Sequence, residues 1–138
     1  MEQRFKEIDY GGDIGVEAWG ENTARVLENA TLGLFSLMVR GGVSSKVERE
    51  IAVQAASAED LLIDWLSEVI TTAASRGEVY CQTQIRSTGP AAVRGVIRGE
   101  PIQSGRHDLR FDVKAATYHD VLFESGEDGC HVRVIFDL

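Results

Sequence analysis

Two segments of the chain repeat apolar residues every three or four positions, which is the spacing of one face of a helix. The first begins after Asn22, a residue type that caps helix starts, and stops before Gly41. The second begins at Ser57 and stops at Gly77. The pattern predicts a helix in each segment, with core faces formed by Val26, Leu27, Ala30, Leu34, Leu37 and Met38, and by Leu61, Leu62, Trp65, Leu66, Val69, Ile70 and Ala73.

Most of the remaining chain alternates apolar and polar residues, as strands with one buried face do. Because strands and helices do not alternate strictly, the predicted class is α+β. We expect one domain over residues 1–138, in which two helices pack on one face of a mixed, mostly antiparallel sheet. The predicted strands are residues 5–9, 14–18, 48–55, 79–88, 92–100 and 109–117, followed by a hairpin of 121–124 and 131–136 with Asp128-Gly129 as its turn.

The charge of the chain narrows the range of partners. Its 14 basic and 22 acidic residues give a net charge of −8, and lysines and arginines do not cluster along the sequence. A protein that holds nucleic acid by its phosphates needs such clusters, so we expect no direct nucleic-acid binding. No apolar run approaches the ~18 residues of a membrane span, and the opening residues are too polar for a signal peptide. We expect a cytoplasmic protein. Cys81 and Cys130 are far apart in the sequence and form no recognisable disulfide framework, which fits a reducing compartment.

Familiar catalytic motifs do not occur in the sequence. There is no GxSxG, HExxH, GxGxxG or GxxxxGK[ST], and the three histidines are not spaced to share one helix face. No nucleophile with a recognisable base can be chosen. The sequence therefore favours a protein that is not itself an enzyme.

Two acidic positions are candidates for cation binding. Asp13 follows Gly11 and Gly12 in a turn, and Asp137 stands beside the free carboxylate of Leu138 after an apolar strand. Oxygen ligands of this kind suit calcium or magnesium better than zinc. The alternatives are an aspartate that bonds its own turn and a hydrated chain end.

Several segments resemble the archease family, in the same order and over nearly the whole chain. Residues 9–16, DYGGDIGV, are similar to the family opening Asp-His-Thr-Ala-Asp-Ile-Gly-Ile, and residues 60–68, DLLIDWLSE, resemble the family helix Asp-Leu-Leu-x-Asp-Trp-Leu-Asn-Glu. Further matches lie in residues 28–38, 114–119 and 134–138. One departure is Tyr10, which stands where the family has histidine.

This resemblance implies a non-enzymatic protein cofactor of the tRNA-splicing RNA ligase, a manganese-dependent enzyme. Archeases promote guanylylation of that ligase and allow its repeated turnover. The resemblance also implies a divalent cation, calcium with magnesium as the alternative, bound by Asp13, Asp137 and the carboxylate of Leu138.

The segment that contains Lys114, Thr117 and Tyr118 also matches a family block, and we expect these three residues to meet the ligase. A solvated Lys114 is the alternative. Other roles left open for the chain are a chaperone or specificity factor of a tRNA methyltransferase, a small metal-dependent hydrolase using Asp13 and Asp137, and a structural subunit.

Overall fold

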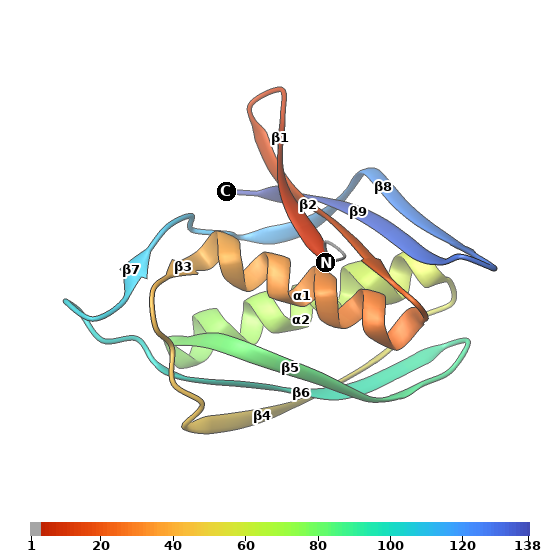
Figure 1. The fold of residues 1–138 in the computed structure, drawn as a ribbon. Coiled ribbons are helices and arrows are strands. Elements are labelled where there is room, and N and C mark those ends of the chain that lie inside the picture. The colour runs from red at the N-terminus through yellow and green to blue at the C-terminus, as the bar shows by residue number, and fades with distance from the viewer. Residues whose placement is uncertain (1–3) are drawn as a thin grey trace.

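Two antiparallel sheets enclose the two helices in three layers, as the computed structural model shows (Figure 1). The structure describes residues 4–138, apart from the side chain of Tyr10. One sheet has the strand order β1-β2-β9-β8, the other β4-β6-β5, and β3 pairs with β7 in a short ribbon. The elements are β1 Phe5–Tyr10, β2 Asp13–Gly20, α1 Thr23–Met38, β3 Val39–Arg40, β4 Val47–Gln54, α2 Ala58–Arg76, β5 Glu78–Thr88, β6 Ala92–Pro101, β7 Asp108–Leu109, β8 Ala115–Gly126 and β9 Gly129–Asp137.

Local capping interactions set the helix ends where the sequence predicted them. The side chain of Asn22 accepts a hydrogen bond from the Arg25 N–H at 2.8 Å, and Ser57 does the same for Asp60 at 3.1 Å. Gly77 ends α2 in the left-handed conformation, at φ 62°. The first helix ends at Met38, ahead of the glycines, because the next residue is already extended and enters β3.

Both helices are buried on more than one side, because each contacts both sheets. Gly33 lets α1 approach β2 closely, since a Cβ there would lie 2.5 Å from Cγ1 of Val16. Trp65 is fully buried at the centre of the core, and its Nε1–H donates to Thr31 Oγ1 at 2.9 Å. The Thr31 hydroxyl donates in turn to the Leu27 carbonyl at 2.6 Å. The predicted core placement of Trp65 is confirmed, and this hydrogen-bond chain links the two helices.

The predicted α+β class with antiparallel pairing is confirmed, and all strand pairs in the described residues are antiparallel. The strands divide among separate sheets, however, so the helices are enclosed between two sheets and do not lie on one face of a single sheet. The second sheet covers the helix faces that a single sheet would leave in water. Among the described residues no helix is both long enough and apolar enough to cross a membrane.

The predicted strand over residues 109–117 is confirmed only at its ends, which belong to β7 and β8, and is wrong for residues 110–114. The N–H groups of Arg110 and Phe111 donate to the carbonyls of Met38 and Leu37, each at 3.0 Å, so this backbone completes the end of α1 and forms no strand ladder. A long strand, β8, begins at Ala115 and includes the predicted hairpin arm. The hairpin itself is confirmed, although its turn lies one residue earlier, at Glu127-Asp128.

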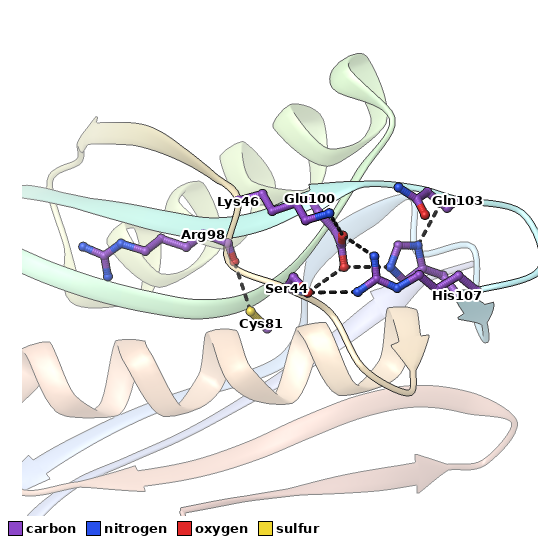
Figure 2. A network of polar contacts seen from close by, with 8 residues as sticks. Ser44, Lys46, Cys81, Arg98, Glu100, Gln103 and His107 are labelled. Atoms are coloured by element: carbon purple, nitrogen blue, oxygen red, sulfur yellow. Dashed lines mark hydrogen bonds and ion pairs between the residues drawn. The ribbon is translucent and has the colours of Figure 1, made fainter.

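A buried carboxylate, Glu100 at the end of β6, holds two loops together (Figure 2). It accepts hydrogen bonds from the Ser44 N–H at 2.6 Å and from Arg106 Nη1 at 2.8 Å, and its Oε2 lies 3.1 Å from His107 Nε2. His107 Nδ1 accepts a hydrogen bond from the Gln103 N–H at 2.9 Å, so a neutral imidazole with its proton on Nε2 satisfies both contacts. The network fixes the β3–β4 and β6–β7 connections to each other.

We expect Trp65→Ala to lower the free energy of unfolding by about 3–5 kcal/mol, because it empties the centre of the core. Trp65→Phe keeps most of the volume and removes the N–H that Thr31 accepts, so its loss should be smaller, about 1–2 kcal/mol. Urea unfolding followed by circular dichroism measures both values. Unchanged stability in Trp65→Ala would show that this ring does not support the core.

Glu100 should make stability depend on pH. The hydrogen bond from the Ser44 N–H, with His107 and Arg106, outweighs burial and lowers the pKa of Glu100 to about 2. A lowered carboxyl pKa adds stability above the ordinary value of 4.5, and this stability is lost as pH falls towards 2. We expect Glu100→Gln to melt at a lower temperature at neutral pH, and the difference from wild type to shrink in acid.

Thermal melts across this pH range measure the effect of Glu100→Gln. The control is Glu127→Gln, because Glu127 is an exposed residue of the hairpin turn, and this variant should follow the wild type. A difference between Glu100→Gln and wild type that stays constant down to pH 2 would contradict the assignment.

Candidate metal-binding site

The central pairing of the four-stranded sheet brings Asp13 and Asp137 to the same edge. At this end of the sheet, the last residue pair between β2 and β9 is Ile14 with Phe136. Asp13 and Asp137 are the next residues on these two neighbouring strands. Phe136 faces the helices, and since side chains alternate along a strand, both aspartates belong to the outer side. Both are exposed. Figure 1 shows the β1–β2 hairpin tip rising beside the end marked C.

The turn before β2 leaves the carboxylate of Asp13 available. Gly11 and Gly12 have φ values of 62° and 97°, which favour glycine at both positions. The Gly12 N–H donates to Asp9 Oδ1 at 3.3 Å, so Asp9 is the aspartate that bonds its own turn. Within the described chain the Asp13 carboxylate has no hydrogen-bond or ion-pair partner, which removes the turn-aspartate alternative considered for it.

The segment that carries Asp137 is part of the sheet up to that residue. Asp137 pairs with Ala115 of β8, and its carbonyl accepts a hydrogen bond from the Lys114 N–H at 2.8 Å. Its side-chain carboxylate has no ionic partner among residues 4–138. Leu138 follows outside the strand and is 48% exposed. The backbone is thus fixed while the carboxylate of Asp137 faces solvent.

The chemistry of this edge fits a hard cation. Neighbouring carboxylates repel one another unless water or a cation neutralises them, and calcium or magnesium takes such oxygen ligands. Within the described part of the chain no three His, Cys, Asp or Glu side chains lie close enough to hold a metal ion. A site here would therefore consist of Asp13, Asp137 and the carboxylate predicted at Leu138. Calcium takes 6–8 oxygens, so water or a partner molecule would have to supply the rest.

Lys114, Thr117 and Tyr118 differ in their exposure and in their contacts. Lys114 lies beside the end of the sheet that carries Asp13 and Asp137, which we call the aspartate edge. Its side chain is 65% exposed, and its Nζ lies 4.0 Å from Asp112 Oδ2. Thr117 is half-buried and donates to the Ile135 carbonyl at 2.8 Å, so its hydroxyl is used within the sheet. Lys114 and Tyr118, which is 54% exposed, are therefore the members of this set that can reach a partner directly.

Tyr118 connects β8 to the start of α2. Its hydroxyl donates to Asp60 Oδ1 at 2.6 Å, and this hydrogen bond, with burial, raises the pKa of Tyr118 to about 12. The register of β8 against β9 is interrupted between Thr117 and Leu122, and Asp120 there has a φ of 51°. Arg133 Nε donates to the Asp120 carbonyl at 3.0 Å and supports this bulge.

Sequence reasoning missed the contacts by which Asp60 and Arg133 hold β8 in place. Asp60 belongs to the matched helix motif, which could have drawn attention to it. Nothing in the sequence around Arg133 indicates its contact with Asp120, because a bulge is set by pairing between strands.

Comparison with known proteins places the whole described fold in one family. A model of the archease protein family matches residues 5–138. The curated protein archease of Methanopyrus kandleri is 31% identical over 91% of each chain, and that of Methanosarcina acetivorans is 27% identical over 99% of this chain and 97% of the relative.

Two solved structures share the fold. The solution structure of Methanobacterium thermoautotrophicum protein 1598 matches with a TM-score of 0.80 and 29% identity, covering 97% of this chain and 98% of that one. The crystal structure of a Thermotoga maritima protein described as an archease and possible chaperone has a TM-score of 0.66 at 24% identity, covering 100% of this chain and 99% of that one. The chain therefore belongs to the archease family.

Proposed function

We propose that this archease binds a divalent cation at Asp13, Asp137 and the carboxylate of Leu138, and activates the tRNA-splicing RNA ligase by promoting its guanylylation and repeated turnover. The observation that carries the proposal is a pair of exposed aspartates at one sheet edge with no ionic partner among the described residues, beside the exposed Lys114. Calcium is the first choice and magnesium the alternative.

The chain's own residues would hold this edge in a fixed shape. Pairing of β2 with β9 sets the spacing of the two aspartates, and the Lys114–Asp137 backbone bond fixes the cationic residue beside them. A bound divalent ion would supply the positive charge that offsets the repulsion between carboxylates. The edge would then present a cation with open coordination positions together with a lysine.

Such an edge suits a partner site that contains anionic groups. Guanylylation transfers the phosphate of a guanine nucleotide to a ligase histidine. Positive charge near the negative charge that develops on that phosphate lowers the barrier to the transfer. In this proposal Lys114 reaches that site with the exposed Tyr118 near it in β8, while the hydrogen bond from Tyr118 to Asp60 ties β8 to α2. The protein acts on another enzyme and performs no reaction of its own.

Removal of one carboxylate should abolish most cation binding. We expect calcium titration by calorimetry to show binding in the wild type, and affinity at least about tenfold weaker in Asp13→Asn and in Asp137→Asn, because each loses a charged ligand. Asp64→Asn on the exposed side of α2 is the control and should bind as the wild type does. Equal affinities in all four proteins would contradict the site.

Loss of the exposed lysine should separate activation from cation binding. We expect Lys114→Ala to keep its melting temperature and calcium affinity but to lose most stimulation of single-turnover guanylylation of the cognate ligase. Lys6→Ala removes a cation on β1, whose Nζ lies 5.9 Å from the Trp19 ring centre, and should stimulate as the wild type does.

Undiminished stimulation by Lys114→Ala would return this residue to the solvated surface. If the wild type stimulated a tRNA methyltransferase and left ligase guanylylation unchanged, the proposed activity itself would be wrong.

A further inference from the structure

The outer face of the three-stranded sheet gathers three arginines that are separated in the sequence. Arg86 is in β5, and Arg94 and Arg98 are in the central strand β6. The helices lie on the other face of this sheet, which leaves the arginine side uncovered in Figure 1. The prediction of no nucleic-acid binding was based on the lack of basic clusters along the sequence. This cluster is instead assembled by strand pairing, which brings together arginines from separate strands.

The register of the sheet creates a hollow around Arg94. Its neighbours across the ladder are Ala52 of β4 and Ser87 of β5, which are both small. Arg86 occupies the extra position of a β-bulge between Ile85 and Ser87. The resulting hollow has a volume of about 380 Å³ and is lined by Glu50, Ile51, Ala52, Arg86, Ser87, Arg94 and Gly95.

The ion pairs on this face leave positive charge unused. Glu48 serves two arginines, with Oε1 2.8 Å from Arg98 Nε and Oε2 3.8 Å from Arg86 Nη2. Arg94 has neither an ion pair nor a hydrogen bond with its side chain in the part of the chain that the structure describes. Around the hollow itself, the described lining has two arginines, Arg86 and Arg94, and one carboxylate, Glu50, on a chain of net charge −8.

The other side chains of the face favour a nucleic-acid backbone over a protein surface. Gln82 and Gln84 lie opposite Arg98 and Val96, and Val96 is fully buried beneath its neighbours. Among the described residues, none of the exposed large hydrophobic side chains, which anchor protein interfaces, belongs to these three strands. Arginine, glutamine and serine are the side chains that contact phosphate and sugar, and the guanidinium fork binds phosphate oxygens in pairs.

We propose that the outer face of the β4-β6-β5 sheet binds the phosphodiester backbone of RNA, with one phosphate in the hollow at Arg94 and Arg86. A second phosphate would lie beside Arg98, whose Nε and Nη2 donate to Glu48 and Gln84, so this contact is the weaker one. Glu50 on the rim limits the affinity. The two helices separate this face from the aspartate edge, which belongs to the other sheet. The proposal is independent of the proposed function, since binding requires neither the cation nor the ligase.

Fluorescence anisotropy with a labelled 12-nucleotide single-stranded RNA tests this surface. Two phosphate contacts at about −0.7 each predict a slope of log K against log salt of about −1.4. Arg94→Ala should weaken binding at least about fivefold at low salt and reduce the slope by about 0.7. Glu50→Gln should strengthen binding about two- to threefold, because it removes repulsion from the rim.

The matched control is Arg25→Ala, which removes the same charge from α1, where Arg25 pairs with Glu28 at 3.3 Å. It should bind RNA within about twofold of the wild type. Melting temperatures of all variants should match the wild type, because these side chains are at the surface. Arg94→Lys keeps the charge without the fork and should give an intermediate affinity.

Three results would overturn the proposal. The first is the lack of RNA binding by the wild type at low salt, and the second is an equal loss of affinity in Arg25→Ala and Arg94→Ala. The third is displacement of the RNA by a poly-glutamate peptide of equal charge at equal concentration, which would make this a surface for carboxylates.

Discussion

The pairing of β9 with β2 on one side and β8 on the other is the constraint on which the rest of the structure depends. It places β9 between β2 and β8 in the four-stranded sheet, and the inward residues of β9 form one wall of the core. The same register brings Asp13 and Asp137 to one edge and leads the backbone of Lys114 to the carbonyl of Asp137. A slip of one residue would turn Phe136 outward and separate the carboxylates.

The outer faces of the two enclosing sheets differ, and the proposed roles differ with them. The four-stranded sheet ends in the exposed aspartates and lysine for which we propose cation binding and ligase activation. The three-stranded sheet presents arginines around a hollow. Between them the contact of Trp65 with Thr31 fixes the helices to each other, so both surfaces are carried by one rigid core.

Features that depend on neighbouring residues could be predicted from the sequence, and features that depend on distant pairing could not. Asn22, Ser57 and Gly77 mark helix ends by bonds within one turn, and the structure has them in those positions. Arg110 and Phe111 bond to carbonyls of α1 far back in the chain, which a local alternation of residues cannot reveal. The arginine face has the same origin, since a bulge and two registers assemble it.

The local pattern made Asp13 and Asp137 candidates for cation binding, but the family resemblance was needed to favour that interpretation. Taken alone, Asp13 fitted a turn residue better, and in the structure Asp9 is the aspartate that bonds this turn. The network around Glu100 had no sequence signal, because Ser44 and His107 reach it from separate loops.

The register of β2 with β9 also has a consequence for how the protein folds. Ile14 pairs with Phe136, so closing this sheet joins segments from nearly opposite ends of the chain. Hairpins β1–β2 and β8–β9 can form early from local contacts, whereas their union waits until a long loop closes, and such topologies fold slowly. Asp13 and Asp137 come together in that late step. A partly folded chain would therefore lack the assembled edge, and only molecules that have completed the sheet could present it.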